Sequence, residues 1–375
     1  MSQPDGARTS SPGLTSSEKA VIEVHVLACG HGDTILLHLP GDKWVLVDCY
    51  LSKYDGTRDR FFEFVESRGI RTLDFVFLTH PDYDHFHGMA DVLEHFTRDG
   101  RSVGTYCDAG VDAQQVRSLL KGRTGETEFE RLQRRLDDLD ERGAINFYAI
   151  NDQHATVSPK GYKGSVDLIP IGPEASRARR LTRRGVAKLQ SDRKAELPAN
   201  ELSIVLVLWA KEGARDICLL LAGDADAEGL EGAMEIWRSR AAEREVDEGF
   251  DAVKVPHHGS FDSHWAELPK TGRKDAAKVA VISAGQRPAL PDRRVIRDFM
   301  DRGWRVLITT RRGGARIRDL PMTLANRGGG VVVGGRATWH DIRLTWDSAR
   351  GLTWEPKEAE IQKSDLQAYE TGSGG

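Results

Sequence analysis

The feature that most constrains the fold is a set of short apolar runs, alternating with charged stretches of helical character, that occurs in each half of the chain. The runs are rich in Val, Ile and Leu and are bounded by Gly-containing turns, which is typical of buried β-strands. They span residues 20–27, 33–39, 43–49 and 73–80, then 203–210, 216–224, 250–258, 278–285 and 304–310. This pattern predicts an α/β protein with two sheets face to face and helices outside, a four-layer αββα sandwich.

Composition sets limits on the class of protein. The chain has 375 residues, 39% hydrophobic, with a net charge of −4, so only a local basic surface would attract a polyanion. Four cysteines are scattered without a C-x-x-C pair, which is typical of reduced thiols in the cytosol. No signal peptide is visible, and the longest apolar run, 203–210, is too short to span a bilayer. We expect a cytoplasmic protein without a membrane span.

The chain divides into a main domain with two insertions and two polar ends. Residues 1–18 are rich in Ser, Thr, Pro and Gly and predict a disordered tail. The main domain is expected at 19–345, with insertions at about 112–160 and 174–199. Residues 346–375 are expected to form a C-terminal extension and polar tail.

Each insertion has a distinct character. Residues 129–143 place apolar side chains at helical spacing on an otherwise charged stretch, which predicts an amphipathic helix. Residues 177–194 contain eight Lys or Arg and a single acid, Asp192. Such a run is usually a solvated surface, and the alternative is contact with a phosphate backbone. The glycine clusters at 310–317 and 326–335 lack the spacing of phosphate-binding loops and are interpreted as turns.

Potential metal ligands are concentrated in "HPDYDH", residues 80–85, directly after an apolar run. His80, Asp82 and Asp84 alternate along the chain, and His85 follows directly. In an irregular turn, alternate side chains converge on one point and the adjacent pair turns to a second point. Carboxylates this close repel one another unless a cation lies between them. A lone histidine is usually an ordinary buried residue, but this density favours a metal site.

Further potential ligands follow other predicted strands. Asp48 ends one strand, Asp224 another, and His257 and His258 a third. Strand ends are where a rigid scaffold presents loops for chemistry. Together with residues 80–85, these positions indicate a dinuclear hydrolase.

These motifs resemble those of the metallo-β-lactamase superfamily, whose signature is H-x-H-x-D-H. The variant H-x-D-x-D-H is similar to that of the hydrolase domain attached to ComEC, a bacterial DNA-uptake channel protein. Further blocks match in order: a G-x-G-D strand pair within 27–49, N-x-x-S-x-V-L at 200–206, "LLAGDAD", "VPHHGSFDS", "VISAGQRPALP" and "ITTRRGGARI". The resemblance covers roughly residues 20–320 and implies the metallo-β-lactamase fold.

The resemblance also implies two divalent metal ions, Zn or Mn. His80 and Asp82 would bind one ion, and Asp84 and His85 the other. Asp224 would bridge them. Of the pair at 257 and 258, His258 is the expected ligand of the second ion and His257 would face the substrate, although the assignment within the pair stays open. Asp48 would orient one of the ligands.

Some positions depart from the family pattern. A further histidine ligand usually lies between the first motif and the bridging Asp, and the candidates here are His87, His95, His154 and Asp108. Leu290 stands where relatives have a histidine. For Asn200, Ser260 and Ser263, a packing role and a substrate contact are both open.

The implied reaction is hydrolysis by a hydroxide that bridges the two metals, with Asp84 and His257 as catalytic residues. No G-x-S-x-G motif suggests another nucleophile. The leading hypothesis is a soluble phosphodiesterase or nuclease acting on DNA or RNA, with the basic insertion contacting nucleic acid through Arg179, Arg180, Arg183 and Arg184. The alternatives are a hydrolase of a small phosphodiester or ester, and a non-catalytic partner in a bacterial operon-encoded defence-type system.

Overall fold

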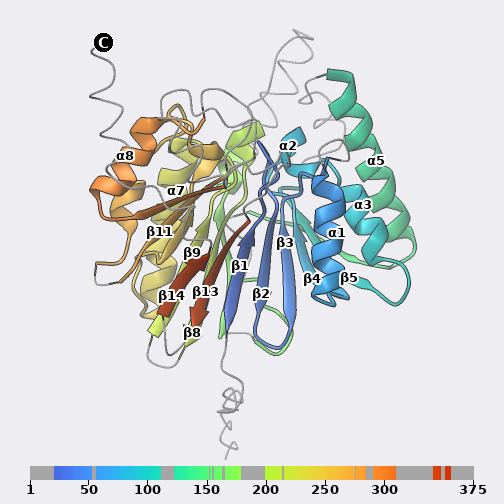
Figure 1. The fold of residues 1–375 in the computed structure, drawn as a ribbon, viewed down its shortest axis with the longest axis horizontal. Helices are drawn as coiled ribbons and strands as arrows, with labels where there is room; N and C mark the ends of the chain where they lie inside the picture. The colour runs from blue at the N-terminus through green and yellow to red at the C-terminus, as the bar shows by residue number, and fades with distance from the viewer. Residues whose placement is uncertain are drawn as a thin grey trace, which may run out of the picture.

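The computed structural model places most of the chain in two sheets and the helices around them (Figure 1). The structure describes residues 21–52, 56–110, 122–151, 153, 156–162, 165–178, 199–212, 215–274, 276–283, 290–309, 341–347 and 351–355. The predicted tail at 1–18, the basic run from 179 onward and both glycine clusters therefore lie outside the described residues.

The first sheet contains eight described strands in the order β14-β13-β1-β2-β3-β4-β5-β6. Strands β3 to β6 are parallel, and β2, β1, β13 and β14 are each antiparallel to their neighbours. The bounds are β1 Ile22–Val26, β2 Ile35–Leu39, β3 Lys43–Val47, β4 Thr72–Phe77, β5 Ser102–Asp108, β6 Asn146–Ala149, β13 Ile342–Asp347 and β14 Gly351–Glu355.

The second sheet contains six described strands in the order β12-β11-β10-β9-β8-β7. Strands β9 to β12 are parallel, and β7 and β8 form an antiparallel pair at one side. The bounds are β7 Val166–Gly172, β8 Val205–Glu212, β9 Arg215–Leu221, β10 Ala252–Lys254, β11 Val279–Ser283 and β12 Arg305–Thr309.

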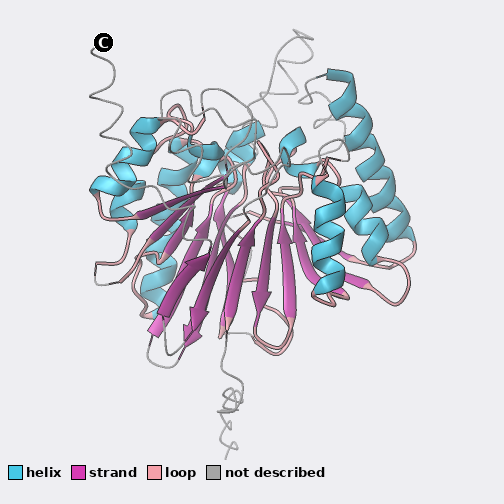
Figure 2. Ribbon diagram, in the orientation of Figure 1, coloured by secondary structure: helices cyan, strands magenta, loops and turns pink. Residues whose placement is uncertain are grey.

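Helices cover the outer face of each sheet, with the strands between them (Figures 1 and 2). The first sheet carries α1 Thr57–Ser67, α3 Met89–Phe96 and α5 Gly122–Glu141, whose apolar side chains share one buried cluster with strand residues such as Leu36 and Leu46. The second carries α7 Ala227–Arg244 and α8 Arg293–Asp301 in a separate cluster. A third cluster lies between the sheets and draws side chains from both. The predicted αββα arrangement is confirmed.

Alternation along the strands explains why both faces of each sheet are buried. In β2, Ile35, Leu37 and Leu39 join the cluster between the sheets, whereas Leu36 joins the cluster under the helices. Successive strand residues point to opposite faces, so a sheet covered on both sides needs an almost continuous apolar run. That requirement is what made the central strands recognisable in the sequence.

Some elements were not predicted. The strands β6, β7, β13 and β14 were missed; β6 is exposed at the sheet edge, and β7 contains Pro170. The domain boundary expected at residue 345 falls inside β13, and β14 belongs to the first sheet. The predicted amphipathic helix begins at Gly122, earlier than expected, and its stripe of Phe129, Leu132, Leu136 and Leu139 is buried as predicted.

The two sheets meet at the edge where their parallel strands end. Strands β1, β3, β4 and β5 finish at this edge of the first sheet, and β9 to β12 finish at the corresponding edge of the second. The backbone N–H of Ile204, just before β8, donates to the carbonyl of Thr79, just after β4, at 2.9 Å. Loops from both sheets are thus held side by side. None of the described helices is long and apolar enough to cross a membrane.

Candidate metal centre

The loop after β4 presents the "HPDYDH" side chains through a short helical turn, α2 Tyr83–Phe86. His80 and His85 are buried, with 1% and 0% of their surface exposed, while Asp82 lies at the rim with 37% of its side chain exposed. The helical turn breaks the expected alternation: it directs both imidazoles inward and leaves the carboxylate of Asp82 toward solvent.

The first group of potential ligands is His80, His85 and Asp224, whose ligand atoms lie within 4.8 Å of one another. Nε2 of His85 is 3.3 Å from Oδ1 of Asp224, and Nε2 of His80 is 3.9 Å from Oδ2. Oδ2 of Asp82 approaches Nε2 of His80 at 3.8 Å. These separations suit atoms that share an ion rather than atoms that bond to each other directly.

A second group lies on the other side of Asp224 and consists of Asp84, His258 and His31, again within 4.8 Å. Nε2 of His258 is 3.8 Å from Oδ2 of Asp84 and 3.8 Å from Oδ2 of Asp224. Nε2 of His31 is 3.3 Å from Oδ2 of Asp84. Asp224 therefore stands between two groups of nitrogen and oxygen donors, the position expected of a bridging carboxylate.

In the 80–85 motif, Nδ1 of His80 and Nδ1 of His85 each have a hydrogen-bond partner. Oδ2 of Asp48 lies 2.7 Å from Nδ1 of His85, and a carboxylate can only accept, so Nδ1 donates. Asp48 also accepts from the backbone N–H and the hydroxyl of Thr79, each at 2.7 Å, and this hydroxyl lies 3.0 Å from Nδ1 of His80. Such partners fix the ring orientation and leave Nε2 directed at the cluster.

Buried polar atoms in the cluster lack hydrogen-bond partners within the described part of the chain. They are Nε2 of His80, His85 and His258, and Oδ1 of Asp224. Buried polar atoms are nearly always satisfied in proteins, so several orphans around one point need an explanation. Imidazole nitrogens and carboxylate oxygens are the donors that bind zinc and related divalent ions, so the residues present fit such ions.

The pKa shifts of His80, His258 and Asp224 agree with that assignment, because they favour neutral rings and an ionised carboxylate. Burial, with the nearby charge of His85, lowers the pKa of His80 to about 3, and burial lowers the pKa of His258 to about 4, so both rings are neutral at pH 7. Burial opposes the charged form of His85, but Asp224 and Asp48 outweigh it and raise its pKa well above the ordinary value. Although burial disfavours its charge, the imidazoles of His85 and His258 hold the pKa of Asp224 well below its usual range.

The His257–His258 pair reaches the cluster through a strained turn. Both residues have left-handed backbones, with φ of 48° and 53°, and Asp48 has φ of 57°. Such conformations are costly for non-glycine residues and gather at functional sites. His258 is fully buried, whereas the side chain of His257 is 24% exposed with Nε2 3.9 Å from Oδ2 of Asp224. The Ser263 hydroxyl, 2.6 Å from Nδ1 of His257, holds that ring.

Two residues of this centre were missed in the sequence. His31 and Asp33 belong to the G-x-G-D stretch, which was identified as a strand pair without a role for either side chain. Asp33 is buried, accepts a 2.8 Å hydrogen bond from Nζ of Lys254, and has its other oxygen 4.0 Å from Nδ1 of His258. The signal was available: a histidine between two glycines after β1, whose end lies at the same sheet edge as Asp48.

The other candidates for an extra ligand do not join the described clusters. His95 lies on α3, beside Glu66 and Phe62. His87 contacts Tyr83 and Tyr50 and approaches Glu128. Asp108 follows β5 and accepts from the backbone of Gly110. His154 lies outside the described residues.

Of the remaining positions, Asn200 and Ser263 border the cluster through His257, since Nδ2 of Asn200 lies 3.4 Å from Nδ1 of that ring. Ser260 caps the 257–259 turn by donating its backbone N–H to His257. Leu290 is half-buried before Pro291.

The described end of the basic insertion is already paired with acids. Arg177 is buried and contacts both oxygens of Asp226 at 2.9 and 2.8 Å, with Glu201 at 3.3 Å. Its guanidinium therefore anchors the start of α7 beside Asp224 instead of facing a nucleic acid. The four arginines predicted to contact nucleic acid, at 179, 180, 183 and 184, lie outside the described residues.

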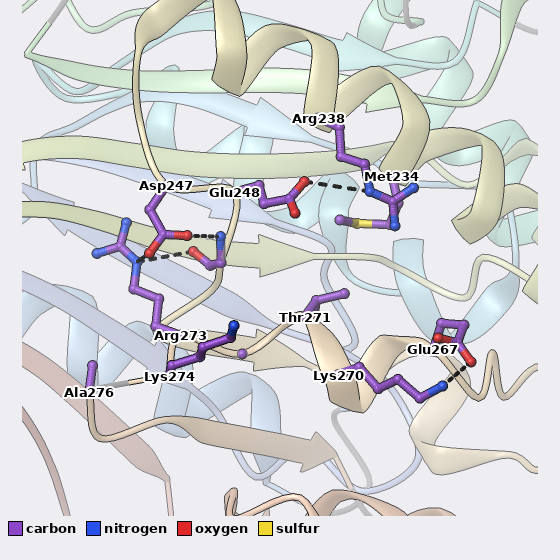
Figure 3. Close-up of a pocket in the computed structure, with 12 residues that line it drawn as sticks. Met234, Arg238, Asp247, Glu248, Glu267, Lys270, Thr271, Arg273, Lys274 and Ala276 are labelled. Atoms are coloured by element: carbon purple, nitrogen blue, oxygen red, sulfur yellow. Dashed lines mark hydrogen bonds and ion pairs between the residues drawn. The ribbon is translucent and has the colours of Figure 1, made fainter.

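A second candidate region is a cavity of about 750 Å³. Figure 3 shows the side chains that line it. Its lining residues precede β10 and β11, so it opens at the edge of the second sheet opposite to Asp224 and His258. Charged side chains around it pair with each other, as Arg238 does with Glu248 at 3.5 Å and Lys270 with Glu267. We therefore place the functional site at the buried cluster and not at this larger cavity.

Comparison with known proteins supports the fold. The family model of the beta-lactamase superfamily domain matches residues 43–159, which include β3 to β6 and the motif at 80–85. With two mixed sheets and helices on both outer faces, the chain has the metallo-β-lactamase fold. The match does not distinguish branches, so the ComEC-like assignment stays a prediction. No curated protein matches the sequence.

Three of the solved structures that resemble this chain at low identity illustrate the match. The metallo-β-lactamase fold protein YhfI from Bacillus subtilis is 12% identical, with 76% of this chain and 96% of that chain covered and a TM-score of 0.41. A diphosphatase of the PhnP family is 12% identical, covering 71% and 87%, with a TM-score of 0.37. The Rm3 metallo-β-lactamase is 14% identical, covering 66% and 84%, with a TM-score of 0.35.

Proposed function

We propose that this protein is a hydrolase dependent on two divalent metal ions, and that its substrate is a phosphodiester, most simply a nucleic acid. The observation that carries the proposal is that Oδ1 of Asp224 and Nε2 of the buried imidazoles around it have no hydrogen-bond partner in the described part of the chain. His80, Asp82 and Asp224 would hold one ion. Asp84 and His258 would hold the other together with Asp224, whereas His85, assigned to this second ion by the family pattern, lies in the group of His80 and Asp224.

When bound, a pair of such ions supplies an activated water and neutralises charge on the attacked group. The protein's own residues fix the geometry for that reaction. Asp48 and Thr79 hold the rings of His85 and His80 so that their Nε2 atoms face inward. Rigid donors cost no reorganisation when charge develops in the transition state.

His257 is the residue best placed to act on the substrate. Its side chain is partly exposed, unlike the fully buried His258, and Nε2 faces the cluster while Nδ1 is held by Ser263. An imidazole in this position can hold or transfer a proton at Nε2 during attack or departure of the leaving group. Asp84, near the rim with 16% of its side chain exposed, would bind metal beside it.

The preference for a phosphodiester rests on ligand chemistry and on sequence. Asp82 stands where the superfamily signature has histidine, which makes the donor set richer in oxygen and tolerant of manganese. The resemblance to the ComEC branch and the arginines at 179, 180, 183 and 184 point to a polyanionic substrate.

The test is a digestion assay with full-length protein and a panel of Mn²⁺, Zn²⁺ and Mg²⁺ on labelled single- and double-stranded DNA and on RNA. We expect cleavage with Mn²⁺ and loss of cleavage in Asp84→Ala. His95→Gln, on α3 and outside the described clusters, is the matched control and should cleave as the wild type does. Nucleic acid left intact with every metal would exclude the nuclease.

A small phosphodiester or ester is the second candidate, favoured by a specific observation. Asn200 and Ser203 line a cavity of about 210 Å³ whose charged lining is one arginine, Arg177, and five glutamates: Glu174, Glu201, Glu228, Glu231 and Glu235. Such an acidic surface would repel a polyanion. Hydrolysis of bis-p-nitrophenyl phosphate without action on DNA or RNA would select this candidate. Metal binding without any turnover would leave a non-catalytic partner of a bacterial multi-protein system.

A further inference from the structure

We propose that His31 is a direct ligand of the metal ion held by Asp84 and His258, which gives this ion an imidazole from the β1–β2 loop. The inference rests on the proposed metal-dependent function and adds to it a residue that none of the sequence motifs assigned. It follows from the place of the ring, from the construction of its loop and from the charges around it.

The distances place His31 within the donor group. Its Nε2 lies 3.3 Å from Oδ2 of Asp84, and its ring centroid lies 4.4 Å from that of His258. One donor atom from each of these three residues falls within 4.8 Å of the others. The side chain of His31 is only 12% exposed, so the three donors enclose a point that is largely shielded from water.

The loop that carries His31 is built to lie against the metal-binding loop. A side chain at Gly32 would meet the carbonyl oxygen of Asp84 at 2.4 Å and Cβ of Tyr50 at 2.3 Å, so only glycine permits this approach. The backbone N–H of Asp33 then donates to the carbonyl of Asp84 at 3.2 Å. Gly30 turns the chain with φ of 86°. These contacts fix the distance between the His31 and Asp84 backbones.

The carboxylate of Asp84 lies between the imidazoles of His31 and His258, at 3.3 and 3.8 Å. Asp33, the other nearby carboxylate, is already neutralised by Nζ of Lys254 at 2.8 Å. A neutral imidazole beside Asp84 adds a nitrogen donor without adding negative charge. Removing it would leave the ion with fewer protein ligands and more solvent.

With His31, the ion near Asp84 would have two imidazole donors, as many as His80 and His85 supply to the other group. Imidazole suits zinc, so we expect the site containing His31 to bind Zn²⁺.

The test compares wild type, His31→Gln and the matched control His95→Gln as full-length proteins, first stripped of metal. Zn²⁺ content after titration against a chromophoric chelator gives the two affinities, and thermal unfolding with and without Zn²⁺ gives the stabilisation by metal. We expect His31→Gln to weaken binding of one of two Zn²⁺ ions by more than about 100-fold, beyond the about 10- to 100-fold contributed by residues that only orient ligands, and to reduce the Zn²⁺-dependent rise in Tm. Its metal-free Tm should equal that of the metal-free wild type.

A second variant, His31→Cys, supplies a spectroscopic readout. With Co²⁺ as the probe, a direct ligand at position 31 should give a thiolate-to-cobalt charge-transfer band that the wild type lacks. Each result bears on the proposal. Equal Zn²⁺ affinity in His31→Gln and wild type, no cobalt–thiolate band, or a lower metal-free Tm in His31→Gln would overturn the role of His31 alone. Failure of the wild type to bind Zn²⁺ or Mn²⁺ would overturn the proposed function as well.

Discussion

The two ends of the strands in the second sheet differ in whether the buried charged groups beside them have partners. At the edge where β9 and β10 end, Asp224 and His258 lie in a tight cluster in which Nε2 of each buried imidazole and Oδ1 of Asp224 lack hydrogen-bond partners among the described residues. At the opposite edge, a cavity of about 750 Å³ is surrounded by acids and bases that satisfy each other. There Arg273 donates to the carbonyl of Gly249 and lies 3.2 Å from Asp251.

We take this difference as the reason to place the candidate site at the unsatisfied ligand atoms and not at the larger cavity. A buried charge without a partner is costly, so a protein retains several at one point only when a ligand compensates them. The ion pairs at the opposite edge need no ligand and serve the fold. The predictions below test each half of this contrast.

The largest effect is expected at the bridging carboxylate. Asp224→Asn keeps the shape but removes the charge that both donor groups share. We expect loss of bound metal and at least about a 1000-fold fall in hydrolysis, equal to several kcal/mol of transition-state stabilisation. Metal analysis and the digestion assay measure this. Asp247→Asn, beside the opposite cavity, is the control and should retain both properties.

The opposite edge should matter for stability instead. Arg273→Met leaves Asp251, which is 0% exposed, buried without its cation. Removing one partner of a buried pair typically costs about 3–5 kcal/mol, so we expect that loss in the free energy of unfolding. Denaturant titration measures it. The exposed neighbour Lys274→Met should change stability by less than about 0.5 kcal/mol. A comparable loss from Lys274→Met would contradict the role of the buried pair.

A smaller effect on metal binding and hydrolysis is expected at Asp48, which contacts the ligand His85 from behind the cluster. Asp48→Asn weakens the hold on His85 and Thr79 without removing a metal ligand. Residues that orient ligands typically contribute about 10- to 100-fold in metal affinity or activity. Equilibrium dialysis with Mn²⁺ and initial rates would show this. An effect as large as that of Asp224→Asn would mean that Asp48 binds metal directly.

The smallest effect is expected at the cavity surface. Arg238→Gln with Lys270→Gln removes two exposed charges whose ion pairs are worth little in water. We expect hydrolysis within about twofold of wild type and stability within about 0.5 kcal/mol. A strong loss of activity in this double variant would indicate that substrate binds at the opposite edge. It would contradict the assignment of the functional site to the buried cluster.

The sequence by itself determined the sheet strands with both faces buried, the αββα arrangement and the donor residues that follow β3, β4, β9 and β10. The spacing of apolar residues and the position where a strand ends are local properties of the sequence. Parallel strands in one sheet bring their ends to the same edge. The strands β13 and β14 escaped prediction because their place depends on pairing with β1, more than 300 positions away in sequence.

Only the tertiary structure decided which side chains meet. It brought His31 to Asp84 through the close approach at Gly32, left His87, His95 and Asp108 outside the described clusters, and turned Arg177 to its acidic partners. It also separated His257 from His258, one partly exposed and one fully buried. These outcomes depend on loop packing and backbone conformation between distant segments, which no local pattern of residues encodes.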